Sequence, residues 1–362
     1  MVDKFSEVRL RDGADCFRAL ESSWRDLERR APSTVFQSWD WCDRWLARHS
    51  RVTPYVVTAG IGEDQSAILP LGLTKTWHGF PVRRVGFLGS GPADYGGAIV
   101  DGDRSTALAA LAPALAGGFD LLDLHQLREA EAKELAGILE SEYSVKIWPQ
   151  EPTLVVETGA DFDSYLSRLS KKFRKNTVYA ARRLRRDFAY EERLSGWGEG
   201  LEGAMDDFFD LHQRRWLSKR LPGLFLGQGN RRVHQELARR LDESGSLALA
   251  ISYIDDEPAA AIYGFKYGRD YSYYLGGFDP RWSKHSVSSV LIQESIKDSC
   301  ERGFERFDFL RGREAYKRRW LAEEVSLFRV IAHTTGPRGR LGAALAKTEN
   351  DVVQKARSRL HE

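Results

Sequence analysis

The feature that most limits the fold of this chain is an order of predicted elements that occurs twice. In the second half, β-rich apolar runs, a polar loop, a helical segment and a closing strand follow one another at residues 247–254, 259–267, 271–278, 279–289, 290–300 and 306–312. In the first half, the same order occupies residues 54–60, 66–75, 82–90, 91–97, 104–117 and 119–127. This order predicts a duplicated αβ module.

The two closing strands also share a short phrase. Gly118-Phe119 precedes Asp123 at the same spacing at which Gly303-Phe304 precedes Asp308. Two unrelated αβ segments would reproduce the order of elements more readily than this phrase, so we expect a true repeat. The predicted fold class is α/β, with mixed sheets of the α+β type in two tandem modules.

Length and composition support two globular domains. The 362 residues are 42% hydrophobic and 29% charged, which is typical of globular proteins, and the chain is long for a single core. We expect a first module at 1–157, a second at 158–336, and a basic terminal helix at 337–362. The few cysteines, Cys16, Cys42 and Cys300, form no Cys-x-x-Cys pair, so we expect neither a disulfide framework nor a metal site.

The sequence also bears on location. The charged N-terminus lacks the apolar core of a signal peptide, and no apolar run is long enough to span a bilayer. We therefore expect a cytoplasmic protein, and peripheral contact with the inner membrane stays open. The net charge of +2 says little about partners.

A strongly basic helix is predicted between the modules, at 166–187. It carries nine Lys/Arg and no acid from Arg168 to Arg186, and Ser170 is a suitable N-cap. A weakly apolar stripe is formed by Phe173, Thr177, Ala181 and Leu184. The basic face is a solvated surface, or it meets coenzyme A phosphates, an anionic acceptor, tRNA or an acidic membrane. It lacks the interleaved aromatic residues that stack on bases, so we do not expect sequence-specific nucleic-acid binding.

Several phrases of the chain resemble a known bacterial family. They are FQSWDWCDRW (36–45), LSKKFRKN (169–176), FFDLHQRRW (208–216), GFDPRWSKHSVSSVLIQESI (277–296) and GFERFDFLRGREAYKRRW (303–320). In this order they resemble the GNAT-type (GCN5-related) acyltransferases called BioF2-like or cellulose-biosynthesis-associated, distant relatives of the Fem peptidyltransferases. The resemblance implies two GNAT-like folds, of which the first is degenerate and lies on the acceptor side. It also implies acyl transfer from a thioester, usually acyl-CoA, to an amine.

The resemblance places the acyl donor in the second module. The strand at 271–278 is expected to part from its parallel neighbour, with Gly276 and Gly277 forming the bulge that opens the pair. The loop and helix start that follow would bind the coenzyme A pyrophosphate through backbone N–H groups, at Ser286, Val287, Ser288, Ser289 and Val290. The family usually has glycine near Ser286, and its absence here leaves a carrier-protein donor or a lost donor site as alternatives.

Four residues are candidates for catalysis. His212 lies in the family phrase Leu-His-x-x-Arg-Trp and is either the base for the amine or a core histidine. Asp308, at the end of the closing strand, would orient the amine or act as base, or simply end the strand. Tyr273 would protonate the leaving thiolate, and His285 would touch phosphate or thioester, although a solvated loop histidine is an equal alternative.

Further residues are candidates for substrate binding. Asp94 and Tyr95 lie in the Gly/Pro-rich loop of the first module and are expected to line an acceptor pocket, although a simple turn explains them almost as well. The remaining candidates come from the second module and would bind substrate or lock the site: Trp216, Arg311, Tyr316 and Lys317.

The leading functional hypothesis is an acyl-CoA-dependent N-acyltransferase. Its acceptor would be a small amine or a lipid amine such as a sphingoid base, or an envelope or exopolysaccharide precursor. A Fem-like, aminoacyl-tRNA-dependent peptidyltransferase is one alternative, although no sustained heptads indicate the coiled-coil insertion of that group. A GNAT scaffold without catalytic activity is the other, supported by the glycine-poor donor loop.

Overall fold

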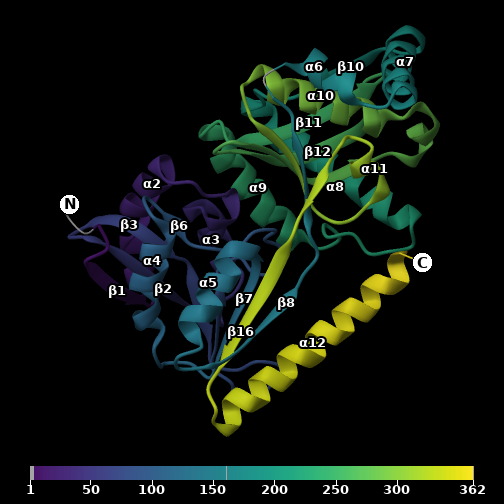
Figure 1. Ribbon diagram of the computed structural model, residues 1–362. Coiled ribbons are helices and arrows are strands. Elements are labelled where there is room, and N and C mark those ends of the chain that lie inside the picture. The colour runs from purple at the N-terminus through teal and green to yellow at the C-terminus, as the bar shows by residue number, and fades with distance from the viewer. Residues whose placement is uncertain (1–3, 160, 362) are drawn as a thin grey trace. The chain divides into compact units, whose positions relative to one another are not determined.

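The computed structural model describes residues 4–159 and 161–361. Residues 1–3, 160 and 362 lie outside the described part. Among them are the start of the expected first module and the last residue of the expected terminal helix. Contacts divide the chain into two compact units, one of residues 1–150 with 326–362 and one of residues 151–325. Each unit is built on its own mixed sheet (Figure 1). The predicted fold class, α/β with mixed sheets in tandem, is confirmed.

The first unit holds the following helices and strands: β1 (Glu7–Asp12), α1 (Ala14–Ala19), α2 (Glu21–Arg30), α3 (Trp39–Leu46), β2 (Thr53–Ile61), β3 (Asp64–Leu69), β4 (Leu71–Thr74), β5 (Arg84–Phe87), β6 (Ile99–Val100), α4 (Arg104–Leu111), β7 (Leu121–Arg128), α5 (Glu129–Leu139), β8 (Ser144–Pro149), β16 (Leu327–His333) and α12 (Pro337–His361). Its sheet runs in the order β6-β3-β2-β4-β5-β7-β16-β8, and β1 pairs with β2. The pair β5 and β7 is parallel, whereas the other paired neighbours described in this sheet are antiparallel.

The second unit holds the following elements: β9 (Thr153–Glu157), α6 (Phe162–Arg168), α7 (Lys171–Asp187), β10 (Tyr190–Arg193), α8 (Leu201–Ser218), α9 (Gln228–Glu243), β11 (Leu247–Ile254), β12 (Glu257–Tyr267), β13 (Asp270–Phe278), the 3-10 helix η4 (Pro280–His285), α10 (Val287–Glu301), β14 (Arg306–Arg311), α11 (Ala315–Arg318) and β15 (Glu323–Val325). Its sheet order is β10-β11-β12-β13-β14-β9-β15. Here the parallel pair is β13 with β14.

The two parallel pairs repeat one another. β5 and β7 pair over three residues, ending at Gly86 with Asp123, and β13 and β14 pair over three residues, ending at Ser272 with Asp308. The shared phrase also has a structural meaning, because Gly118 and Gly303 both adopt left-handed backbone conformations, with φ of 76° and 78°. Glycine is the residue that adopts this conformation with little strain, so each module needs it to turn into its closing strand.

The observed boundaries differ from the expected 1–157 and 158–336. β9 lies before residue 158, yet it pairs with β14 of the second unit. β16 lies before residue 337, yet it fills the first sheet between β7 and β8. The chain therefore crosses between the units twice, and strand pairing, which joins distant segments, sets the boundaries.

The cap and the apolar stripe predicted for the basic helix are confirmed, but the helix is shorter than the expected 166–187. Residues 166–168 end α6, and Leu169 and Ser170 are not helical. Ser170 accepts a hydrogen bond from the backbone N–H of Phe173 at 3.4 Å, and α7 begins at the next residue, Lys171. The predicted stripe is the buried face: Phe173, Thr177, Ala181 and Leu184. Packing of this stripe against the core leaves the Lys/Arg side chains outward. None of the described helices combines the length and hydropathy needed to cross a membrane.

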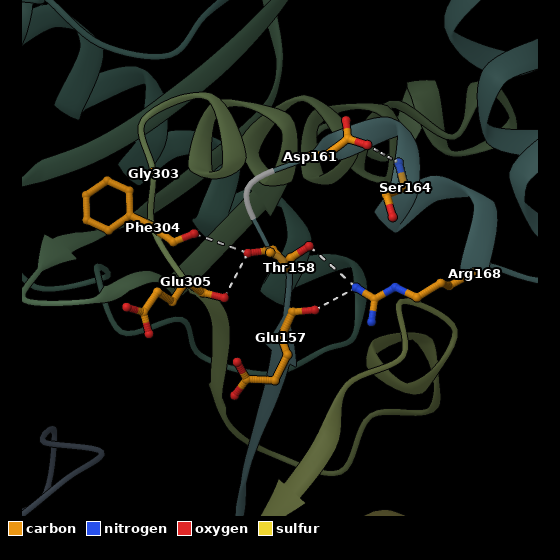
Figure 2. Close-up of a pocket in the computed structure, with 9 residues that line it drawn as sticks. Glu157, Thr158, Asp161, Ser164, Arg168, Gly303, Phe304 and Glu305 are labelled. Carbon is orange, nitrogen blue, oxygen red and sulfur yellow. Dashed lines mark hydrogen bonds between the residues drawn. The ribbon is translucent and has the colours of Figure 1, made fainter.

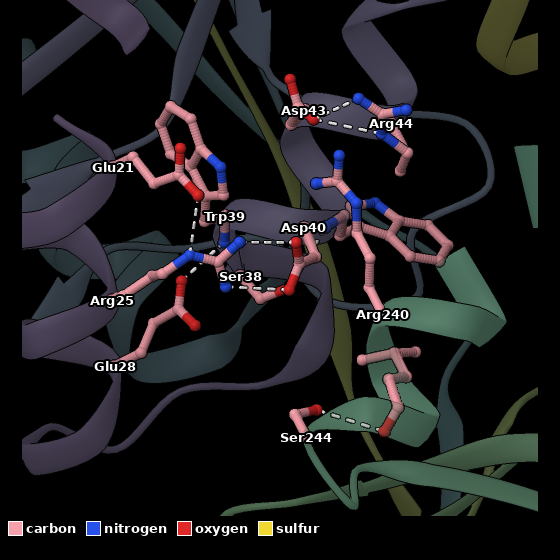
Figure 3. A network of polar contacts seen from close by, with 12 residues as sticks. Glu21, Arg25, Glu28, Ser38, Trp39, Asp40, Asp43, Arg44, Arg240 and Ser244 are labelled. Carbon is pink, nitrogen blue, oxygen red and sulfur yellow. Dashed lines mark hydrogen bonds and ion pairs between the residues drawn. The ribbon is translucent and has the colours of Figure 1, made fainter. Parts of the chain in front are cut away.

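The tryptophan-rich segment at 36–45 serves the core of the first unit. Arg25 of α2 contacts both carboxylate oxygens of Asp40 at 3.0 and 2.7 Å, and Glu28 accepts the backbone N–H of Trp39 at 2.6 Å (Figure 3). These contacts fix α2 to the start of α3. Trp39 and Trp41 are buried there.

Candidate functional site

Strands β13 and β14 part after a short parallel stretch. They pair at Asp270–Arg306, Tyr271–Phe307 and Ser272–Asp308, and no later pair joins them in the described chain. β13 continues to Phe278 along β12 alone. The parting of these strands, which the sequence predicted, opens one backbone edge of β13 over residues 273–278.

A bulge on β13 lies at a different residue from the one expected. Tyr263 of β12 pairs with Leu275 and Gly264 pairs with Tyr273, so Tyr274 is the extra residue. Gly277 instead allows close approach of α8, because a Cβ atom there would lie 2.2 Å from the backbone nitrogen of His212. A Cβ atom on Gly276 would lie 2.0 Å from the Tyr273 hydroxyl. The two glycines therefore make room for a helix and a tyrosine.

Tyr273 occupies the point where the strands part. Its ring is buried, and its hydroxyl oxygen interacts with the side chains of Tyr316 and Arg215. Arg215 also donates from Nη1 to the carbonyl oxygen of Gly276 at 3.0 Å. Burial, above all, raises the pKa of Tyr273, while the hydrogen bonds oppose the shift. The hydroxyl therefore keeps its proton at neutral pH and can donate it.

The segment after β14 locks the end of this strand. Lys317 is buried, and its Nζ donates to the carbonyl oxygens of Leu310, Arg311 and Gly312 at 3.4, 2.7 and 3.3 Å. It also lies 2.9 Å from Glu314 Oε2. Of the two expected roles, this geometry favours locking the site over binding a substrate.

Asp308 is bound by its own strand. Its Oδ1 accepts the backbone N–H of Leu310 at 2.7 Å, and Leu310 is left-handed with φ of 55°. The carboxylate therefore stabilises a strained backbone next to the parting point. Asp123, at the equivalent place in the first unit, contacts Arg84 at 2.7 Å and Arg329 at 2.7 and 2.8 Å. A structural role at both positions fits the repeat.

His212 has the surroundings of a core histidine. Nε2 accepts the indole N–H of Trp216 at 2.9 Å, and Nδ1 is buried without a hydrogen-bond partner in the described chain. Phe225 packs edge-on to the ring with a centroid distance of 4.9 Å. Burial, then the charge of Arg215, lowers the pKa of His212 to about 4. A histidine whose lone pair is already used is a poor base, so the geometry favours a packing role.

The start of α10 forms the candidate donor loop. Ser286, the N-cap, is left-handed with φ of 58° and ψ of 30°, the conformation that glycine would adopt in this position. Val287 and Val290 are buried in the core of the unit, and the N–H groups of Ser289 and Val290 already donate to the carbonyl oxygen of Ser286 at 2.9 and 3.1 Å. Val287 and Ser288 are therefore the residues that can offer a ligand backbone N–H groups at this helix start. Ser288 and Ser289 are half-buried. The loop reaches the required backbone conformation without glycine, although at a cost in strain.

His285 and Asp279 support this loop from η4. The His285 ring lies 5.2 Å from Phe188 at the end of α7 and 5.6 Å from Trp282. Asp279 caps η4 and accepts from Arg214 of α8 at 2.7 Å. Burial works against the charged form, but hydrogen bonds from Arg281 and Arg214 lower the pKa of Asp279 to about 2. A permanent carboxylate thus ties α8 to the donor loop.

The other predicted residues are divided between the two units. Trp216 and Arg311 are half-buried in the second unit. Asp94 and Tyr95 are buried in the first unit, where the Arg128 guanidinium lies 4.7 Å from the Tyr95 ring. The structure therefore brings Tyr273, Tyr316 and Lys317 to the parting strands.

A surface pocket lies at the other end of β14, away from these residues. It is formed around the end of β9, the start of α6 and the turn before β14, with Thr158, Arg168 and Glu305 among its lining residues (Figure 2). Arg168 donates to the carbonyl oxygen of Glu157 at 2.7 Å, and Thr158 donates to that of Glu305 at 3.0 Å. None of the predicted site residues lines this pocket.

Among the described residues, one group has atoms close enough to hold a metal ion. Asp123, His125 and Glu349 each offer a ligand atom within 4.8 Å of the others. The same carboxylates pair with Arg329, which contacts Glu349 at 2.7 Å. Burial opposes ionisation, yet Arg84, His125 and Arg329 hold the pKa of Asp123 well below its usual range. The arginines already neutralise these acids, so the cluster is best described as an ion-pair network.

Two residues of the site were not selected from the sequence. Arg215 stands in the phrase Leu-His-x-x-Arg-Trp beside His212, and Glu314 stands inside the Gly-x-x-x-Tyr-Lys phrase that begins at Gly312. Burial is the main cause that raises the pKa values of Tyr273 and Tyr316, and the charge of Glu314 adds to both shifts. Both phrases pointed to this region, but a charged residue in a helix or loop reads as solvated surface until its partner is known.

Comparisons with known proteins agree with this arrangement. Residues 171–318 match the family model described as an acetyltransferase (GNAT) domain. No curated protein sequence matches the chain.

Among solved structures, the fold resembles that of FemX, with a TM-score of 0.65 and 10% identity over 88% of this chain and 96% of that one. L-PGS from Bacillus licheniformis has a TM-score of 0.53 and 12% identity, over 88% of this chain and 92% of that one. A conserved protein of unknown function from Bacteroides thetaiotaomicron has a TM-score of 0.57 and 11% identity, over 91% and 100%. The segment 171–318 is thus similar to GNAT acetyltransferase domains, and the fold of the whole chain is similar to that of FemX.

Proposed function

We propose that the protein is an N-acyltransferase that binds an acyl thioester along the open edge of β13 and transfers the acyl group to an amine. The observation that carries this proposal is the parting of β13 and β14 after Ser272 and Asp308, with a protonated Tyr273 at the parting point. Along residues 273–278, β13 is not joined to β14, and this edge offers backbone hydrogen bonds to the amides of a pantetheine arm, although Arg215 already occupies the Gly276 carbonyl oxygen. The start of α10 offers backbone N–H groups and a positive dipole to the pyrophosphate of acyl-CoA.

The chemistry requires a proton donor for the leaving group. The amine nitrogen attacks the thioester carbon, the C–N bond forms, and the C–S bond breaks to release a thiolate. The nitrogen loses one proton as it becomes an amide, and this proton restores the Tyr273 hydroxyl after Tyr273 has protonated the thiolate. We assign to Tyr273 the proton for this thiolate, because its buried hydroxyl stays protonated at the parting point, with the side chains of Tyr316 and Arg215 beside it. Burial makes Tyr273 a weaker acid than free tyrosine, and a thiol is normally a stronger acid than either. The tyrosinate that forms when the proton leaves therefore has to be stabilised, and the charge of Arg215 is the group that can do this.

Glu314 is the carboxylate that we assign to the acceptor amine. Half of its side chain is exposed, and its charge acts on both Tyr273 and Tyr316. A carboxylate in this position can hold the incoming ammonium and accept its proton. Glu314 Oε2 lies 2.9 Å from Lys317, but half of the Glu314 side chain is exposed to an acceptor. His212 and Asp308 are less suited to this task, because both are buried and their Nε2 and Oδ1 atoms already accept hydrogen bonds.

Calorimetry with the full chain tests donor binding. We expect acyl-CoA to bind, and the variant Ser288→Glu, which adds a negative charge beside the α10 start, to weaken that binding about tenfold through repulsion of the pyrophosphate. Ser218→Glu, an exposed serine at the end of α8, is the matched control. If acyl-CoA does not bind but a pantetheine-bearing carrier protein does, the carrier protein would replace acyl-CoA as the donor in this proposal. Absence of both would favour a non-catalytic scaffold.

A Fem-like transfer from aminoacyl-tRNA is the second candidate, favoured by the fold shared with FemX and by the basic face of α7. Exposed Lys171, Lys172 and Lys175 have no acidic partner in the described part of the chain. Incubation with labelled aminoacyl-tRNA and with acyl-CoA, followed by mass spectrometry of the products, separates the two donors. We expect label transfer from acyl-CoA alone.

We propose a lipid amine or an envelope precursor as the acceptor, at a cytoplasmic or peripheral membrane location. The exposed cations of α7 suit anionic surroundings of that kind. Comparison of extracted lipids and glycans from cells with and without the protein would identify the acylated product. A change confined to soluble small amines would exclude a membrane acceptor.

A further inference from the structure

The last turn of α8 and the segment that follows it expose an unusual number of leucines. Leu217, Leu221, Leu224 and Leu226 are 58, 37, 40 and 68% exposed, within ten residues of one another. Single exposed apolar side chains are common on soluble proteins, but a local group of this size marks an interaction surface. We call residues 217–226 the leucine loop.

The leucine loop is held in a defined conformation. Its anchor is Phe225, which is fully buried and lies 4.6 Å from Phe209 and 4.9 Å from His212 between ring centroids. Asn230 donates to the carbonyl oxygen of Leu224 at 2.8 Å, and Arg231 donates to that of Phe225 at 3.0 Å. With Phe225 facing inward, its neighbours on both sides face outward. The exposure of the leucines is therefore imposed by packing and hydrogen bonds.

The chain around the loop is basic, although two of its cations, Arg214 and Arg231, pair with Asp279 and Asp210. From Leu211 to Gln235 the chain contains six Lys/Arg and no acid. Lys219, Arg220 and Arg232 are exposed and have no acidic partner among the described residues. Exposed leucines amid unpaired cations match an anionic bilayer, where the leucines enter the interface and the cations meet lipid phosphates. An acidic protein would meet the cations, but it would not account for the apolar side chains between them.

We infer that the leucine loop binds the surface of an anionic membrane. The leucine loop begins only two residues after Arg215, and Arg215 lies against Gly276 and Tyr273 at the parting strands. Docking of the loop would therefore bring that site close to the bilayer, where a lipid acceptor is found. This last consequence rests on the proposed function, whereas membrane binding itself does not.

Sedimentation of the full chain with lipid vesicles tests the inference. We expect binding to vesicles of phosphatidylcholine with phosphatidylglycerol and little binding to phosphatidylcholine alone. Leu217→Ser with Leu226→Ser should weaken binding at least about tenfold, since each buried leucine contributes strongly. Lys219→Glu should weaken it about fivefold and reduce its salt dependence. The matched control is Ile61→Ser with Val352→Ser, which removes exposed apolar groups elsewhere and should leave binding unchanged.

Three outcomes would overturn the inference. One is absence of binding to anionic vesicles, and another is equal loss in the control and loop variants. The third is a dimer in sedimentation velocity that the loop variant converts to a monomer without vesicle binding, because the loop would then serve self-association. Acyl transfer between a soluble donor and a soluble amine, measured in the same variants, should persist. If the wild-type protein shows no such transfer, the proposed function is rejected, whereas the result on vesicle binding still holds.

Discussion

At the scale of single residues, the proposed transfer depends most on the hydroxyl of Tyr273. Tyr273→Phe keeps the ring but removes the proton for the leaving thiolate, so we expect kcat to fall about 100-fold. Tyr316→Phe removes only a partner of that hydroxyl, and we expect a loss below about tenfold. Steady-state kinetics with a saturating thioester would check both. Equal losses in the two variants would assign the proton to another group.

His212 gives a prediction on the pH dependence of stability. Its pKa is lowered to about 4 in the folded chain, against an ordinary value of 6.5, so the unfolded chain binds the extra proton between these values. Stability contributed by the neutral ring is therefore complete above pH 6.5 and is lost as the pH falls toward 4. The free energy of unfolding should drop by about 3 kcal/mol across this range. Chemical denaturation of His212→Gln should show a flatter profile.

Ser286 tests the strain in the donor loop. The left-handed conformation with φ of 58° costs a serine about 1 kcal/mol relative to glycine. Ser286→Gly should therefore raise the thermal midpoint and retain donor binding. Ser286→Val should lower the midpoint, because β-branched residues are the least tolerant of positive φ. A fall in the midpoint of the glycine variant would show that the serine side chain matters more than the strain.

At the scale of elements, the end of β14 depends on α11. Lys317 is buried, and its ammonium donates to the backbone carbonyl oxygens of Leu310, Arg311 and Gly312. Lys317→Met fills the space but leaves these oxygens without their donor, at a cost of about 2–3 kcal/mol. Denaturant titration would measure this loss, with the exposed Lys284→Met as the control. Hydrogen exchange should quicken first at residues 310–320.

At the scale of the whole molecule, the crossing of β9 and β16 decides which fragments can fold. A fragment of residues 151–325 contains every strand of the second sheet, whereas 158–336 lacks β9 and carries β16 without its partners. We expect the first fragment to give dispersed amide resonances and a cooperative thermal transition. The second should aggregate, because β14 would have an open edge. Equal behaviour of the two fragments would contradict the observed boundary.

Much of the architecture could be predicted from local patterns. The strands at 247–254 and 271–278 and the helix capped by Ser170 depend on alternation, turn residues and a cap, which are properties of neighbouring residues. The strands of the first module were harder to predict, because Pro70 divides the strand expected at 66–75 into β3 and β4. The candidate donor strand and its parting from β14 could also be named in advance, from phrases that resemble a family.

The sequence by itself determined the repeat and the order of its elements, and its phrases that resemble a family indicated the segments that meet at the parting strands. Only the tertiary structure decided that β9 and β16 belong to opposite units, that Lys317 binds carbonyls, and that Arg215 reaches Tyr273. Periodicity and turn chemistry act between residues that are close in the chain. Hydrogen-bond partners, burial and the pKa values that follow from them depend on residues that folding brings together from far apart.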